Sequence, residues 1–136
     1  MPWKKFPYPE SAYRYPAAAL EKNWSRLHRG DCEPWPADAR LQDAWRHYHA
    51  GDFEAAATGG LACGIAGNNV ANKATIIHAH YLETDAARKQ QLLQAVVERS
   101  EQQQKAAPQD VNGWFLHALA LGRYSQSISI AKALAQ

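Results

Sequence analysis

The stretch that decides the fold runs from Ala44 to Ala56 and reads Ala-Trp-Arg-His-Tyr-His-Ala-Gly-Asp-Phe-Glu-Ala-Ala. Its aromatic and small residues recur three and four positions apart on both sides of Gly51, which is the spacing of side chains on one face of a helix. Glycine permits a tight turn because it has no Cβ atom. The stretch therefore predicts two helices joined by a turn at Gly51-Asp52.

The rest of the chain follows the same helical spacing, and no segment alternates apolar and polar residues with period two. The pattern predicts an all-α fold of seven helices, the last six in pairs, over residues 17–29, 37–50, 53–66, 70–82, 86–107, 111–122 and 125–136. Asp85 and Asp110 are expected to cap the helices that follow them. Residues 98–105 are almost wholly polar, so this part of the fifth helix is expected to project into solvent.

The N-terminal sixteen residues differ from the rest, since they hold four prolines and five aromatic residues. Proline has no backbone N–H and favours extended chain. We expect residues 1–16 to form an extended arm over the surface of the domain and, as a hypothesis, to occupy a binding groove as a mimic of its ligand. Residues 1–136 then form one domain, with the arm followed by a helix at 17–30 and helix hairpins at 37–136.

Composition excludes several classes of protein. With 15 Lys and Arg against 13 Asp and Glu, the net charge of +2 gives no footprint of nucleic-acid binding. No run of about 18 apolar residues predicts a membrane span, and the first residues do not read as a secretory signal. Cys32 and Cys63 have no CxxC pattern, so neither a disulfide framework nor a zinc site is expected. The expected compartment is the cytoplasm.

The turns near Gly51, Thr84 and Arg123 are 33 and 39 residues apart, close to a 34-residue repeat. With this spacing, the stretch from Ala44 to Ala56 resembles a tetratricopeptide turn, and residues 108–119 resemble the junction between two such repeats. The resemblance covers residues 37–136 and implies a right-handed array of three helix hairpins. It also implies a protein- or peptide-binding adaptor or assembly module.

In such arrays the first helices of the hairpins line a concave groove. The groove-facing positions of the family fall here on Trp45, Tyr48, His49, His78, Tyr81, Phe115, Leu119 and Arg123. Most are aromatic or apolar, which suits an extended peptide or an apolar helix better than an acidic tail. The alternative is that some of the same side chains, Trp45 and Leu119 among them, are only core between helices.

No motif for catalysis or for a cofactor emerges. The glycine-rich residues 58–67 lack the Gly-Lys-Ser/Thr ending of a phosphate-binding loop and are expected to let helices approach closely. The histidine pairs 47/49 and 78/80 are two positions apart, so on a helix they point in different directions and cannot chelate a metal together. We therefore expect no catalytic residues, no metal and no cofactor.

Two alternatives to a binding module remain. One is a helical small-ligand binder or enzyme with a site around His78, Tyr81 and Phe115, and the other is a part of a larger tetratricopeptide scaffold. The last predicted helix carries an apolar stripe with no following helix to cover it, formed by Ile128, Ala131, Leu134 and Ala135. This stripe predicts either self-association into a homo-oligomer through the C-terminal helix or a chain that is shorter than its natural relatives.

Overall fold

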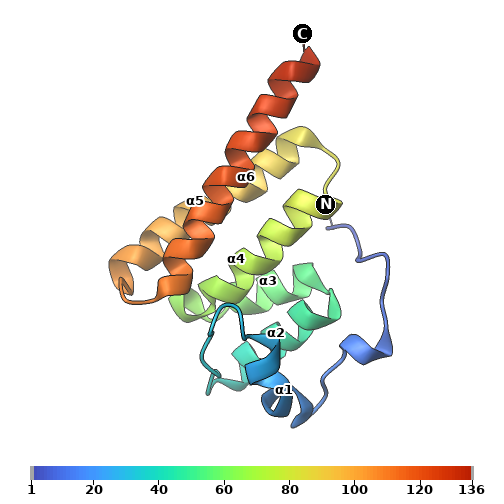
Figure 1. Cartoon of the computed structure of the whole chain (residues 1–136), viewed down its shortest axis with the longest axis vertical. Helices are drawn as coiled ribbons and strands as arrows, with labels where there is room; N and C mark the ends of the chain where they lie inside the picture. Colours follow the sequence, from blue (N-terminus) through green and yellow to red (C-terminus); the bar gives the residue numbers. More distant parts are fainter. Residues whose placement is uncertain (1, 136) are drawn as a thin grey trace.

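The structure is a computed structural model that describes residues 2–135, and over this range it contains six α-helices and no strand (Figure 1). The prediction of an all-α fold is confirmed. The helices are α1 (Ala19–Leu27), α2 (Ala39–Ala50), α3 (Phe53–Leu61), α4 (Asn68–Ile77), α5 (Ala86–Ala106) and α6 (Val111–Ala135). Short 3-10 turns, η1 and η2, lie at Ser11–Tyr13 and Gly64–Gly67, and a π-helical turn, η3, follows α4 at His78–Leu82.

Polar residues and one glycine set the helix ends, and of these the caps at Asp85 and Asp110 and the turn at Gly51 were expected. The Asp38 and Asp85 carboxylates accept hydrogen bonds from backbone N–H groups two residues later, at the starts of α2 and α5. Asp110 does the same at the start of α6 through the Asn112 N–H, at 3.1 Å. Gly51 ends α2 with a φ of 85°, a left-handed conformation that favours glycine. The predicted turn at Gly51 is present.

The helices pack in chain order, since α2 contacts α3, α3 contacts α4, α4 contacts α5 and α5 contacts α6. Helix α4 also contacts α2 and α6. One core cluster lies among α1, α2, α3 and α4 around Trp24 and Trp45, and a second lies among α4, α5 and α6 around Leu93 and Leu116. The three helices α2, α4 and α6 therefore lie side by side, with α4 in the middle.

Gly60 and Gly67 allow a very close approach of two backbone segments. A Cβ atom on Gly67 would lie 1.7 Å from the Gly60 carbonyl oxygen, and one on Gly60 would lie 2.7 Å from the Gly67 carbonyl oxygen. The expected close packing within residues 58–67 is thus confirmed for this pair. Gly64 plays a different part, because its surroundings are open and its φ of 68° is what requires glycine.

Two expectations about the second half of the chain are wrong. The turn near Arg123 does not exist, because α6 continues without a break from Val111 to Ala135 and pairs with α5. The predicted helices at 111–122 and 125–136 are therefore one helix, and the third hairpin is not formed as predicted. Residues 98–105 do not simply project into solvent either, since Ser100 and Gln103 are buried.

The N-terminal arm runs along the outside of the helices, as Figure 1 shows in dark blue. It is extended apart from η1, and Trp3, Phe6 and Tyr15 pack against the first core cluster. The helix expected at 17–30 is shorter, because Ala17 has a positive φ of 51° and α1 ends at Leu27.

Candidate functional site

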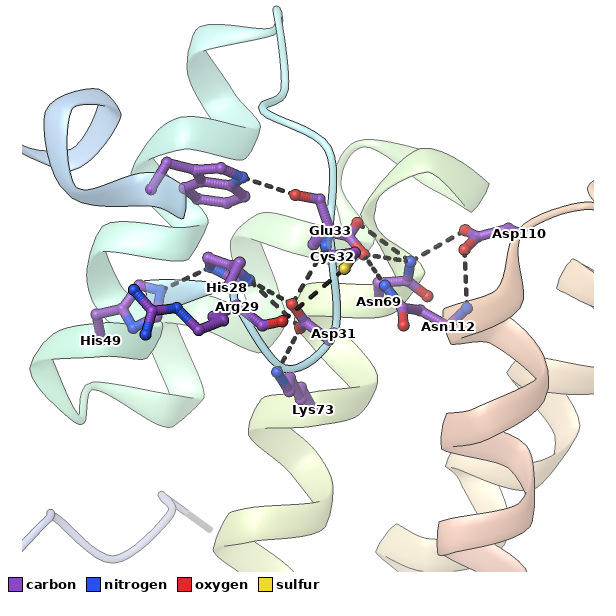
Figure 2. A network of polar contacts seen from close by, with 11 residues as sticks. His28, Arg29, Asp31, Cys32, Glu33, His49, Asn69, Lys73, Asp110 and Asn112 are labelled. Carbon is purple, nitrogen blue, oxygen red and sulfur yellow. Dashed lines mark hydrogen bonds and ion pairs between the residues drawn. The ribbon is translucent and has the colours of Figure 1, made fainter. Parts of the chain in front are cut away.

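The loop between α1 and α2 lies across α2, α4 and α6 and is held there by polar contacts (Figure 2). Trp24, on α1, anchors it by donating from Nε1 to the Glu33 carbonyl oxygen at 2.7 Å. The loop contributes His28, at its start, and the carboxylates of Asp31 and Glu33. We call these contacts the loop network.

One end of the loop network joins the loop to α2 and α4. The Nδ1 atom of His28 lies 3.0 Å from Asp31 Oδ1, and its Nε2 atom lies 2.9 Å from Nε2 of His49. Lys73, on α4, donates to Asp31 Oδ2 at 2.6 Å. The His28 ring also stacks on Trp24, with ring centroids 3.8 Å apart. This end is a chain of four polar side chains from three parts of the sequence.

The other end joins the loop to α4 and α6 through amides. The Glu33 carboxylate accepts from Asn69 Nδ2 at 3.0 Å and from Asn112 Nδ2 at 2.6 Å. Asn69 Nδ2 also lies 3.0 Å from Asp110 Oδ2, while Asn69 Oδ1 accepts from Gln103 Nε2 at 2.8 Å. Because Asn69 is buried at the centre of these contacts, it fixes the relative positions of the loop, α5 and α6.

Burial sets the ionisation of these groups. It lowers the pKa of His28 although Asp31 is adjacent, and together with His28 it lowers the pKa of His49 to about 4. Burial raises the pKa of Glu33, and the amides of Asn69 and Asn112 offset only part of this rise. Burial also opposes ionisation of Asp31, but Lys73 and the Glu33 N–H outweigh it and lower the pKa of Asp31.

A cleft of about 770 Å³ opens beside the loop network. Its walls come from the loop and from the start of α6, and they are formed by Gly30, Asp31, Cys32, Pro34, Gln109, Asp110, Val111, Asn112 and Phe115. Val111 is 76% exposed and Phe115 is 55% exposed, although both are large and apolar. The cleft therefore has apolar side chains at its rim and carboxylates in its walls.

The carboxylates in these walls are already engaged. Asp31 is bound to His28 and Lys73, and Asp110 accepts from Asn69, Gln103 and the Asn112 N–H. The contacts of these carboxylates hold the walls in place. The surface of the cleft that remains accessible to a ligand is mainly apolar. Such a cleft is suited to binding more than to proton transfer.

The predicted groove residues do not all face one open surface. Trp45 is only 3% exposed and packs against Trp24, and Tyr48 and His49 are half-buried beside it. Burial raises the pKa of Tyr48 to about 12. His49 is occupied by His28, so the chain's own loop covers this part of the predicted groove.

The remaining predicted positions are spread over three places. His78 is fully buried beneath Trp3, and Leu119 packs against the second core cluster. Tyr81 is 70% exposed next to His80. Arg123 is partly exposed one helical turn beyond Leu119, where it lies 3.4 Å from Gln126. Of the eight residues, Phe115 is the one that lines the cleft.

Sequence reasoning missed the loop network, although one signal was present. Asn68, Asn69 and Asn72 lie in the first turns of α4, three and four positions apart, and all three are buried. Buried amides need partners, so this spacing points to polar side chains on neighbouring elements. Among the partners, Glu33 lies in a loop, where helical periodicity carries no information.

Among residues 2–135, no three or more His, Cys, Asp or Glu side chains are grouped so that they could hold a metal ion. No helix in the same range is long and apolar enough to cross a membrane. Comparison of the chain with models of protein families, with curated proteins and with solved structures gives no match.

Proposed function

We propose that this protein is a non-catalytic binding module, an adaptor or assembly module that holds an extended peptide of a partner protein in the cleft between residues 30–34 and the start of α6. One observation carries the proposal: Val111 and Phe115 are exposed at the rim of a concave cleft whose walls are fixed by buried polar contacts. Aromatic and aliphatic anchors beside a rigid pocket are the usual centre of a binding surface.

The stiffness of the walls supports this use. A wall that is already ordered costs little further conformational entropy when a ligand binds, so more of the contact energy appears as affinity. The cleft is bounded by the Asp31–Lys73 contact, which joins the loop to α4, and by the Asp110–Asn69 contact, which joins the start of α6 to α4. The adjacency of α2, α4 and α6 also supports a tetratricopeptide-like array as part of the proposal.

The proposal includes a cellular compartment. A reducing compartment such as the cytoplasm suits the free thiols of Cys32 and Cys63, of which Cys32 is exposed at the cleft. Where the chain belongs to a larger scaffold, the same cleft serves as one of its binding surfaces. The rival function, an enzyme or small-ligand binder around His78, Tyr81 and Phe115, is less well supported because His78 is buried under Trp3.

The test is a selection of peptides from a random display library on the full chain, followed by fluorescence anisotropy with each enriched peptide. We expect at least tenfold weaker binding to Phe115→Ser. The matched control is Leu61→Ser, which removes a similarly exposed apolar side chain from α3. Failure to enrich any peptide, or equal binding to the chain and to Phe115→Ser, would contradict the proposal.

A further variant tests how far the binding surface extends. Tyr81→Ser removes an exposed aromatic that does not line the cleft. Unchanged binding limits the site to the cleft, whereas weaker binding extends it along the predicted groove toward η3.

A second proposed interaction is self-association through the end of α6. Along the predicted stripe, Leu134 is 83% exposed and Ala135 is exposed, while Ile128 and Ala131 are partly covered. Analytical ultracentrifugation at increasing concentration should show a reversible oligomer that Leu134→Lys abolishes. A monomer at every concentration would exclude this interaction.

A further inference from the structure

The N-terminal arm is attached to the helices by two aromatic side chains. Trp3 stacks on the ring of His78 with centroids 4.5 Å apart and an interplanar angle of 16°. Phe6 meets Phe53 edge to face at 6.3 Å, and its ring lies so close to Gly51 that a Cβ atom there would be 2.8 Å from it. Gly51 therefore has two roles: it allows the turn between α2 and α3, and it leaves room for the Phe6 ring.

The residues between these two anchors point away. Lys4 and Lys5 are exposed, as are Pro2 and Pro7 on either side. The backbone N–H of Trp3 donates to Glu54 Oε2 at 3.3 Å, which is a long hydrogen bond on an exposed surface. The segment is therefore recognised through an aromatic-x-x-aromatic spacing in extended chain, and the intervening side chains are free to vary.

The surface under Trp3 has the character of a ligand site. His78 is fully buried, and its Nδ1 atom has no hydrogen-bond partner. Its Nε2 atom lies 3.4 Å from the Glu83 carboxylate, which is a distant contact. Buried polar atoms without partners are uncommon in folded proteins, and π-helical turns such as His78–Leu82 occur frequently at functional sites.

The arm does not fill the space it covers. A pocket of about 410 Å³ that is open to solvent lies between residues 2–6 and the turn from α2 to α3, at Ala50–Ala55. The arm is therefore not sealed against the helices along this stretch. The arm instead rests on the surface through its two anchors.

We propose that the surface formed by His78, Phe53 and Gly51 is a binding site for an extended peptide of a partner protein that presents two aromatic side chains three positions apart. Residues 2–6 are the chain's own occupant of this site, and the partner's segment displaces them. The site is separate from the cleft at Phe115, so this inference goes beyond the function proposed above. It gives the module a second contact, which opens only when the arm is released.

Because the arm is covalently attached to the chain, it competes strongly with any free peptide for this site. A segment joined by a short flexible linker is present at an effective concentration in the millimolar range. A free peptide of the same affinity must therefore compete with the arm, and its apparent affinity for the intact chain is reduced accordingly. Removal of the two anchors removes this competition.

The experiment uses the full chain and the double variant Trp3→Ala/Phe6→Ala. The probe is a fluorescein-labelled peptide with the sequence of residues 2–9, and the control peptide replaces its Trp and Phe by Ala. We expect the probe to bind the double variant at least tenfold more tightly than the unchanged chain, and the control peptide to bind neither. No binding to the double variant, or equal binding of the probe to both proteins, would overturn the proposal.

A second measurement decides the matter if the double variant fails to fold. The unchanged chain is labelled with 5-fluorotryptophan, and the Trp3 signal is assigned with Trp3→Phe. Excess unlabelled probe should move the ¹⁹F resonance of Trp3 toward its position in the free peptide while the other tryptophan signals stay in place. A Trp3 resonance unaffected by millimolar probe would show that the arm is a permanent part of the fold.

Discussion

The Nε2 atom of His49 lies 2.9 Å from the Nε2 atom of His28, and this contact has a defined direction. The Asp31 carboxylate can only accept, so His28 Nδ1 carries a proton and donates to it. In neutral His28, Nε2 is then an acceptor, and the donor must be His49 Nε2. The contact therefore requires at least one of the two rings to be neutral, because two protonated rings have no acceptor to share.

The lowered pKa of His49, caused first by burial, predicts a pH dependence of stability. The pKa of His49 is about 4 in the folded chain and near 6.5 when unfolded, so the unfolded chain binds the extra proton between these values. Stability should therefore be complete above pH 6.5 and fall by up to about 3 kcal/mol as pH drops toward 4. Urea denaturation across this range measures the slope.

The histidines two positions apart provide the control. His49→Gln keeps a donor toward His28 but does not titrate, so the slope between pH 6.5 and 4 should become shallower. His47→Gln makes the same substitution at a half-exposed side chain on the same helix and serves as the matched control. Equal slopes for the original chain and His49→Gln would show that His49 is not the titrating group.

Asn69→Ala should be strongly destabilising. It leaves the partly buried Glu33 and Asp110 carboxylates and the buried Gln103 amide without a shared partner, a loss that costs about 2–4 kcal/mol. Asn23→Ala removes a partly exposed amide bonded to its own helix and should change stability by less than about 1 kcal/mol. Thermal denaturation compares the two, and similar midpoints would mean that the loop network does not hold the loop.

Gly67→Ala tests the close approach of the two backbone segments. Its Cβ atom would overlap the Gly60 carbonyl oxygen, so α3 and α4 must separate, at a cost of about 3 kcal/mol or more. Gly30→Ala places a methyl group where nothing lies within 4 Å and should change stability by less than about 0.5 kcal/mol. Urea denaturation of both variants should separate them clearly, and equal stabilities would disprove the close contact.

Gly122 tests the continuity of α6. Because nothing lies within 4 Å of a Cβ atom there, Gly122→Ala should stabilise the helix by about 0.5–1 kcal/mol. Gly122→Pro should destabilise it by about 3 kcal/mol, since proline interrupts a helix interior. Denaturation followed by circular dichroism distinguishes these outcomes from a chain that turns at residues 122–125, in which proline would be tolerated.

The errors of the sequence analysis have physical causes. Gly122 predicts a helix end, but one glycine costs a helix only about 1 kcal/mol, which packing of Tyr124 on the second core cluster offsets. The polar residues 98–105 were assigned to solvent, yet Gln103 is buried because Asn69 and Asp110 bind its amide. Hydrophobic periodicity identifies apolar stripes and does not detect hydrogen bonds between buried polar side chains.

Hydrophobic periodicity and turn residues correctly predicted the helix ends that depend on local chemistry. The turn at Gly51 and the caps at Asp85 and Asp110 follow from local chemistry and are present. The cleft could not be predicted, because it depends on where the loop after α1 lies against α6, and that position is set by contacts between residues up to 79 positions apart. Phe115 lines the cleft, and it is a predicted groove residue because it is an aromatic on the first helix of a predicted hairpin.

The most direct test of the account is a methyl NMR titration of the full chain with a peptide enriched in the display selection. Val111 and Val70 are matched reporters, since the first is exposed at the cleft and the second is buried between helices. We predict that the Val111 methyl resonances shift in a saturable manner while those of Val70 do not move, and that Phe115→Ser removes the shift. Binding that leaves Val111 unchanged would place the peptide elsewhere and contradict the proposed cleft.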